Sequence, residues 1–265
     1  MKKSLRLTET AVMLALGFIL SMLKIIDMPF GGSVTAFGML PVIVIAYRHK
    51  TAWGLLAGFA ASILQLLSGM KDLTYATSAG AVIAIIMLDY VVAFAVMGLG
   101  GIFRGRIKDQ GLSLAAGALV VCALRYLCHV ISGCTVWAGV SIPTSDGLLY
   151  SFIYNAAYMI PETVITVAGA YFAGKVFTLT GEHIKRVPID TRSAGNLVSS
   201  VPVALATVIS FVLIFAMIQT EEGFDITAIT RTTIYSWIPV IILMILGTAA
   251  TLIIKRAGFK EKKAG

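Results

Sequence analysis

The stretch that decides the fold runs from Arg125 to Trp137 and reads RYLCHVISGCTVW. It ends an apolar run that begins near Leu112, so Arg125 and His129 fall where a lipid bilayer would be. Ionisable side chains are costly at that depth and usually mark a functional site. The two residues are one helical turn apart and therefore share a helix face. This stretch predicts a polar site inside a bundle of membrane-spanning helices.

The composition agrees with a membrane protein that crosses the bilayer several times. The 265 residues are 58% hydrophobic and only 13% charged, and the mean hydropathy is +0.92. A soluble domain is about half apolar and about a quarter charged. The net charge of +8 comes from short clusters between apolar runs rather than from one basic stripe, which argues against nucleic acid as a partner.

Eight apolar runs divide the chain, and most are about as long as the ~20 residues that a spanning helix needs. They cover residues 8–26, 36–47, 51–68, 77–103, 112–133, 148–177, 197–218 and 233–254. Residues 28–33 are rich in Pro and Gly and are predicted to form a loop. The expected fold is an all-α polytopic membrane protein: a six-helix bundle (1–178), a cytoplasmic connector (179–196), and a C-terminal extension of two transmembrane helices with a basic tail (197–265).

The distribution of Lys and Arg predicts the orientation in the cell membrane. Most of the 21 basic residues fall on one side, in residues 2–6, 48–50, 104–108, 175–192 and 255–263. The loops on the opposite side carry acidic residues. Because cytoplasmic loops are enriched in Lys and Arg, both termini are expected to be cytoplasmic.

The intramembrane polar residues then fall in the outer half or the middle of the membrane. Asp89 lies deep in an apolar run, beside Tyr90, and is either functional or paired with Arg125 merely to fix helix packing. His129 is either a ligand contact or a hydrogen-bonded packing residue. Trp137 and Tyr150 are either ligand contacts or aromatic residues of the membrane interface.

One helix face in the sixth run is unusually polar. Ser151, Asn155, Tyr158 and Glu162 recur at spacings of four, three and four residues. A buried amide such as that of Asn155 needs partners for both its carbonyl and its amino group. Glu162 follows Pro161, which kinks helices, and could be a hinge residue, a second ligand contact or a proton site.

Several familiar motifs are missing from the sequence. There is no Gly-x-x-x-x-Gly-Lys-Ser/Thr phosphate loop, no His-Glu-x-x-His and no Gly-x-Ser-x-Gly. The three cysteines form no Cys-x-x-Cys pair and are expected to be free thiols, so we expect no metal site and no cofactor. These absences argue against an enzyme and against a chain that hydrolyses ATP itself.

Small residues in the first run give that helix a face on which another helix can approach closely. Ala11 and Ala15 are one turn apart, and Gly17 follows. The face either packs inside the bundle or docks another membrane subunit.

These residues together resemble the thiamine-specific S component of energy-coupling factor (ECF) vitamin transporters. The resemblance covers about residues 5–177. It rests on the order and spacing of these features: Thr8-Glu9-Thr10-Ala11-x-x-x-Ala15, Pro41, Asp89-Tyr90, Arg125-Tyr126-x-x-His129, Trp137 and Tyr150-x-x-x-x-Asn155.

The resemblance implies a six-helix protein that captures thiamine from outside and works with a shared transmembrane subunit and two cytoplasmic ATPases. It implies substrate contacts at Asp89, Tyr90, His129, Trp137, Tyr150 and Asn155. The polar positions of Arg125, Ser151 and Glu162 make these three residues possible additional contacts. Ala11 and Ala15 would dock the shared subunit. The family usually has Glu at the position of Asp89, and the two C-terminal helices lie outside its pattern.

Three alternatives remain from the sequence: an S component for another small vitamin, a secondary transporter that works alone, and a membrane-embedded enzyme that uses Asp89, His129 and Glu162 as acid–base groups.

Overall fold

The computed structural model describes residues 3–28, 31–137, 147–188, 191–220, 223–224 and 228–261. Pro29 and Phe30 of the predicted loop lie outside these ranges. The chain forms two compact units, Met1–Arg186 and Val187–Gly265. Seven helices in the described ranges are long and apolar enough to cross a membrane, which confirms the all-α polytopic class.

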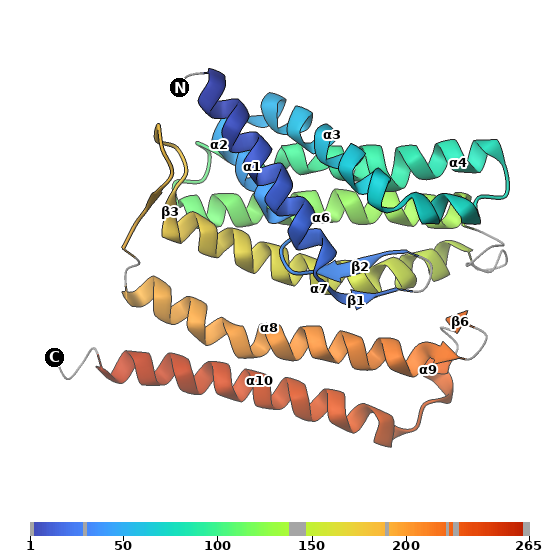
Figure 1. The fold of residues 1–265 in the computed structure, drawn as a ribbon. Helices are drawn as coiled ribbons and strands as arrows, with labels where there is room; N and C mark the ends of the chain where they lie inside the picture. Colours follow the sequence, from blue (N-terminus) through green and yellow to red (C-terminus); the bar gives the residue numbers. More distant parts are fainter. Residues whose placement is uncertain are drawn as a thin grey trace. The chain divides into compact units, whose positions relative to one another are not determined.

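The first unit is a bundle of six helical segments (Figure 1). They are α1 (Lys3–Met22), α2 (Leu40–His49), α3 (Thr51–Ser68), a composite segment (Ala79–Gly101), α6 (Gln110–Thr135) and α7 (Gly147–Val176). Only α2 is shorter than a span, as the sequence predicts. A short 3-10 helix, η1 (Met70–Tyr75), follows α3, and the pair β3 (Phe177–Thr178) and β4 (Lys185–Arg186) follows α7.

The composite segment changes its helical geometry along its length. It begins as α4 (Ala79–Ile85), continues as a π-helix, η2 (Ile86–Val92), passes through α5 (Ala93–Ala95) and ends as a 3-10 helix, η3 (Val96–Gly101). π-helical turns are rare and often occur at functional sites. Here the π-helical stretch carries Asp89 and Tyr90, so the change of geometry sets the direction of both side chains.

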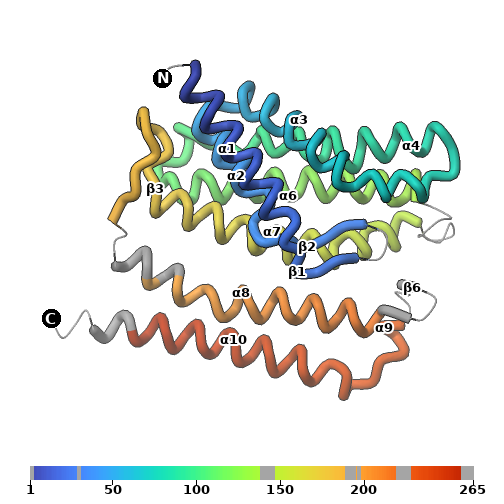
Figure 2. The backbone as a smooth tube through the Cα atoms, in the orientation of Figure 1, coloured from blue at the N-terminus to red at the C-terminus, as the bar shows by residue number. Residues whose placement is uncertain are grey.

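Small residues allow the inner helices to approach closely. A Cβ atom added to Gly117 of α6 would lie 2.0 Å from the carbonyl oxygen of Gly100 in η3. Such contact leaves no room for a side chain, because protein interiors are close-packed. The two longest helices of the first unit, α6 and α7, lie side by side (Figures 1 and 2).

Two short strands form an antiparallel pair, which we call the hairpin, where the sequence predicts the end of a helix and a loop. Strand β1 (Lys24–Asp27) pairs antiparallel with β2 (Ser33–Thr35), with Asp27 opposite Ser33. Gly31 and Gly32 have φ angles of +88° and +83°, values that glycine adopts at no steric cost. The first helix therefore ends at Met22, and the prediction of a helical run to Ile26 is wrong.

The second unit contains α8 (Thr191–Ile218), α9 (Ala228–Arg231), α10 (Ile234–Glu261) and the short strands β5 (Gln219–Thr220) and β6 (Gly223–Phe224). Helices α8 and α10 lie side by side (Figure 1), and Gly247 of α10 sits against Ala206 of α8. Both helices expose large apolar side chains, as expected for helices in lipid.

Candidate functional site

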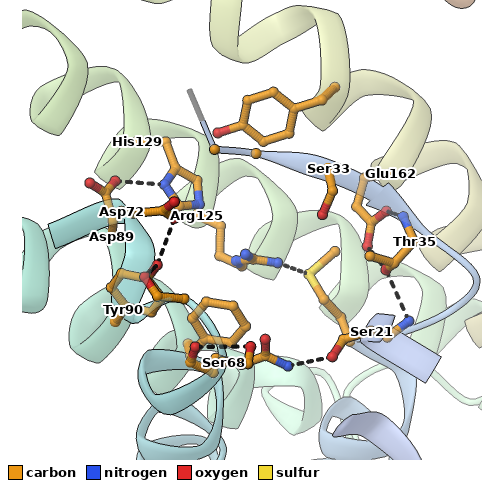
Figure 3. A pocket seen from close by; sticks show the side chains of 18 of the residues that line it. Ser21, Ser33, Thr35, Ser68, Asp72, Asp89, Tyr90, Arg125, His129 and Glu162 are labelled. Atoms are coloured by element: carbon orange, nitrogen blue, oxygen red, sulfur yellow. Dashed lines mark hydrogen bonds and ion pairs between the residues drawn. The ribbon is translucent and has the colours of Figure 1, made fainter. Parts of the chain in front are cut away.

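The first unit contains a cavity of about 540 Å³, which we call the large cavity. Its lining side chains come from α1, the hairpin, α3, η1, the composite segment, α6 and α7. It gathers these residues singled out from the sequence: Asp89, Tyr90, Arg125, His129, Trp137, Asn155 and Glu162. Figure 3 shows Asp89 and His129 at one end, Glu162 and Thr35 at the other, and Arg125 between them.

Asp89 is the centre of a hydrogen-bond cluster at its end of the cavity. One carboxylate oxygen lies 2.9 Å from His129 Nδ1, and the other accepts hydrogen bonds from Ser132 Oγ at 2.6 Å and Trp137 Nε1 at 3.3 Å. His129 and Ser132 lie near the end of α6 and Trp137 follows it directly, so all three partners come from the stretch 125–137. Asp89 and His129 are largely but not fully buried, with side-chain exposures of 17% and 11%, so a ligand in the cavity can reach them.

Arg125 does not pair with Asp89, so the ion pair considered from the sequence is wrong. Its Nη1 lies 2.6 Å from Met39 Sδ, and its guanidinium lies 4.3 Å from the centre of the Phe94 ring. Its buried Nε has no hydrogen-bond partner in the described part of the chain. Arg125 and His129 share a helix face, but His129 is one turn nearer the end of α6, where Asp89 lies.

Tyr90 forms the cavity wall beside Asp89. Its hydroxyl contacts Asp72 Oδ2 at 2.8 Å and the Gly69 carbonyl oxygen at 3.0 Å. From the sequence, Asp72 is simply one of the acidic residues between apolar runs. Asp72 lies close to Tyr90 because η1 folds back after α3. The hydrophobic periodicity of the sequence does not predict that fold-back.

The polar face of α7 is buried, and its members bind one another. Asn155 Nδ2 donates to the carbonyl oxygens of Ser151 and His129, at 2.8 and 3.2 Å. Tyr158 donates its hydroxyl to Asn155 Oδ1 at 2.6 Å. Both ends of the Asn155 amide are therefore satisfied within the protein, and this network fixes α7 against the end of α6.

Two predicted residues do not line the large cavity. Ser151 is fully buried and donates its hydroxyl to the Val130 carbonyl oxygen at 2.8 Å, which joins α7 to α6. Tyr150 is buried but lies one turn before Tyr154, whose hydroxyl already donates to the Gly31 carbonyl oxygen. The hairpin covers α7 at Tyr154, and Tyr150 lies beyond that contact.

Glu162 joins α7 to the hairpin at the opposite end of the cavity. Its carboxylate accepts hydrogen bonds from the Thr35 backbone N–H at 2.5 Å and from Thr35 Oγ1 at 2.7 Å. Glu162 is 3% exposed. A buried carboxylate needs such donors, so Glu162 holds the hairpin at the cavity edge.

Sequence reasoning missed Tyr75, Tyr154 and the hairpin part of the wall, and it identified Tyr158 only as a member of a polar helix face. Tyr154 and Tyr158 stack edge to face with ring centres 6.2 Å apart, and the Tyr158 ring covers Gly32. Tyr75 lies 5.8 Å from Trp137, measured between ring centres. The tyrosines at 150, 154 and 158 recur every four residues, and this spacing was the available signal.

Ala11 and Ala15 are exposed on α1, whereas Gly17 is buried against the Gly38 carbonyl oxygen. Of the two alternatives for this face, internal packing therefore applies to Gly17 and not to the two alanines. In the described ranges, no three His, Cys, Asp or Glu side chains gather closely enough to hold a metal ion.

Comparison with known proteins gives consistent matches to one group. The sequence model of the family described as "Thiamine transporter protein (Thia_YuaJ)" matches residues 7–177. The thiamine transporter ThiT of Bacillus subtilis is 33% identical over 175 residues, covering 62% of this chain and 87% of the relative. ThiT of Lacticaseibacillus paracasei is 27% identical over 183 residues, with 63% and 85% covered.

A solved structure has a similar fold. ThiT from Listeria monocytogenes superimposes with a TM-score of 0.54 at 20% identity, covering 66% of this chain and 96% of that structure. The curated relatives are both named transporters, and α8 and α10 lie beyond the residues that the family model matches.

Proposed function

This chain belongs to the thiamine transporter family, and on that premise we propose that it is the substrate-capture subunit of an ECF-type vitamin transporter. It binds thiamine in the large cavity, with Asp89 as the principal contact. The observation that carries this proposal is the partly exposed carboxylate at the end of a cavity of about 540 Å³. Pockets for small ligands commonly measure about 300–1,000 Å³.

The carboxylate of Asp89 suits the aminopyrimidine ring of thiamine. An ionised carboxylate offers about four lone-pair positions, and the side chains of His129, Ser132 and Trp137 occupy three. One position remains for the amino group of the ligand. A hydrogen bond to a charged acceptor is about twice as strong as one between neutral groups.

Aromatic rings near Asp89 suit the positively charged thiazolium ring. Trp137, Tyr75, Tyr154 and Tyr158 line the same cavity, and an aromatic face attracts a cation by about 0.5–2 kcal/mol. We therefore assign the substrate contacts to Asp89, Tyr90, His129, Trp137 and Asn155. Tyr150 contributes only if a ligand displaces the hairpin from Tyr154. Ser151 and Glu162 act as supports, and Arg125 closes the cavity from the side of Met39.

The orientation follows from the two ends of the helices. Ser21 and Gly69, at the ends of α1 and α3, line the large cavity, whereas the basic residues Arg6 and Lys50 lie near the beginnings of the same helices. Basic ends face the cytoplasm. The cavity therefore opens outward, and both termini are cytoplasmic.

The exposed alanines of α1 supply a docking face for a shared transmembrane subunit, which connects the chain to two cytoplasmic ATPases. Small residues on an exposed helix face allow close approach of a second helix in lipid. Residues 1–178 form the thiamine-binding bundle, and residues 179–196 form a connector. Residues 197–265 form a C-terminal extension that takes no part in thiamine binding.

Calorimetric titration of the purified chain tests the proposal. Thiamine is expected to bind at one site per chain and to be recovered unchanged, as mass spectrometry can establish. Oxythiamine, which carries an oxo group in place of the amino group, is the matched control. Loss of one charge-assisted hydrogen bond is worth about 1.5–3 kcal/mol, so oxythiamine should bind about 10- to 150-fold more weakly. No binding of thiamine, or equal binding of both compounds, would contradict the proposal.

A further inference from the structure

A second cavity, of about 380 Å³, lies in the first unit at the other end of α1 and α3. Its lining residues include five basic side chains, and no described lining residue is acidic; we call it the basic cavity. The five are Arg6, Arg48, His49, Lys50 and Arg104, and Thr180 and Gly181 complete the wall.

Arg48 is the fixed back wall of the basic cavity. Its side chain is 1% exposed and pairs with both oxygens of Glu9, at 2.6 and 2.7 Å. It also donates to the carbonyl oxygens of Leu179, Gly181 and Glu182, at 2.7–2.9 Å. Glu9 carries one negative charge, which compensates that of Arg48, and His49 Nε2 lies 3.0 Å from the same carboxylate. Glu9 leaves the charges of the other basic residues uncompensated.

Those remaining cations have unused hydrogen-bond donors. Arg6 stacks on the Trp53 ring at 3.9 Å, and its buried Nε has no hydrogen-bond partner in the described ranges. Arg104 uses Nη1 for two backbone carbonyls, those of Tyr47 and Arg48. Its other guanidinium nitrogens remain available for an anion.

The beginning of α3 adds further donors at the same place. Lys50 is exposed and is the N-cap residue of α3, with no side-chain cap hydrogen bond and no acidic residue in the first turn. At this end, the Gly54 N–H donates to the Lys50 carbonyl oxygen, at 2.9 Å. The preceding N–H groups of this 18-residue helix carry partial positive charge and favour an anion.

We propose that the basic cavity binds a phosphate group, carried either by a lipid headgroup or by a free phosphate ester. Guanidinium groups match phosphate oxygens with paired N–H donors. The site lies at the basic ends of membrane-spanning helices, the level of lipid headgroups, where basic pockets between helices bind anionic lipids. The inference is independent of thiamine binding, because no residue that lines the basic cavity lines the large one.

The test uses the full chain in detergent and two matched double variants. R6Q/K50Q removes one Arg and one Lys from the basic cavity and leaves Arg48 and its carbonyl bonds in place. R106Q/K108Q removes the same charges from exposed positions that do not line the cavity. Since the Lys50 side chain is exposed, the single variant K50Q also serves if the double variant does not fold.

Two readouts distinguish the sources of the phosphate. The first is the shift of the melting temperature with inorganic phosphate against chloride at equal ionic strength. The second is retention of phosphatidylglycerol against phosphatidylcholine in native mass spectrometry. The wild type and R106Q/K108Q should bind inorganic phosphate, phosphatidylglycerol or both. R6Q/K50Q should bind the same probe at least about tenfold more weakly.

Each result decides the proposal. A response to phosphate alone supports a free phosphate ester, and retention of phosphatidylglycerol alone or together with it supports a lipid headgroup. If neither probe binds the wild type, or if both double variants weaken binding equally, the cavity has no phosphate site and only general surface charge acts.

Discussion

Replacement of Asp89 by Asn isolates the charge of the proposed thiamine contact at almost constant volume. The carboxylate oxygens of Asp89 accept from Ser132 and Trp137 and contact His129 Nδ1. An Asn side chain has only one acceptor oxygen, and its NH₂ group must face at least one of these donors. The variant therefore loses both charge-assisted bonding to the ligand and part of the cluster that holds the site.

The expected magnitude follows from these contacts. Loss of a charge-assisted hydrogen bond to the thiamine amino group costs about 1.5–3 kcal/mol, which weakens binding about 10- to 150-fold. A donor left unpaired in the cluster destabilises the fold by about 1–3 kcal/mol. The melting temperature should therefore fall together with the affinity.

Calorimetry with thiamine and thermal unfolding of the same samples separate the two effects. Asp109→Asn is the matched control for thiamine affinity only, because Asp109 caps the beginning of α6 and does not line the large cavity, whereas its ion pair with Lys175 affects the melting temperature. Asn is an equally good N-cap residue. Asp89→Glu keeps the charge and should lose less affinity than Asp89→Asn. A folded Asp89→Asn protein that binds thiamine as tightly as the wild type would refute the assignment.

Three further predictions follow from contacts elsewhere. Glu162→Gln keeps one acceptor for Thr35 and should weaken the attachment of the hairpin to α7 by about 1–3 kcal/mol. Hydrogen exchange of residues 33–36 should then become faster than in the wild type, while exchange in α3 stays the same. Unchanged exchange in residues 33–36 would contradict this prediction. Ala11→Trp with Ala15→Trp should abolish thiamine uptake by cells while purified protein still binds thiamine, and retained uptake would remove the docking role. The ion pair with Lys175 lowers the pKa of Asp109. This partly exposed pair stabilises the fold by about 0.2–1 kcal/mol. The stabilisation is present above the ordinary Asp pKa of about 4 and is lost as the pH falls through the lowered pKa. Lys175→Met should therefore reduce the melting temperature at pH 7 and make no difference at strongly acid pH; an equal reduction at both would exclude the ion pair.

The positions of the helices could be predicted from the sequence because lipid imposes a simple rule on length and polarity. The runs at 51–68 and 112–133 correspond closely to α3 and α6. The run at 77–103 contains the composite segment, but hydropathy gives no sign of the π-helical turn at Asp89. The close approaches of α3 and α6 to η3 at Gly98 and Gly100 are likewise invisible to hydropathy.

The candidate site was predictable as a set of residues but not as a set of contacts. The spacing of Arg125 and His129 places both on one face, yet only the depth and rotation of the facing helix decide that Asp89 meets His129. The hairpin was missed because its apolar residues continue the hydropathy of the first helix. Strand β1 pairs with β2 beyond two glycines, Gly31 and Gly32. The hairpin is attached through Thr35 to Glu162, which is 127 positions further along the chain. No local sequence pattern predicts a contact at that separation.

The most direct test of the account is the fluorescence of Trp137 during thiamine titration. The chain has three tryptophans, so Trp53→Phe with Trp237→Phe leaves only the one whose indole N–H donates to Asp89. The account predicts a saturable change in Trp137 emission with one thiamine per chain, at the same midpoint as calorimetry. Calorimetric binding without any change in Trp137 emission would place thiamine outside the large cavity and contradict the account.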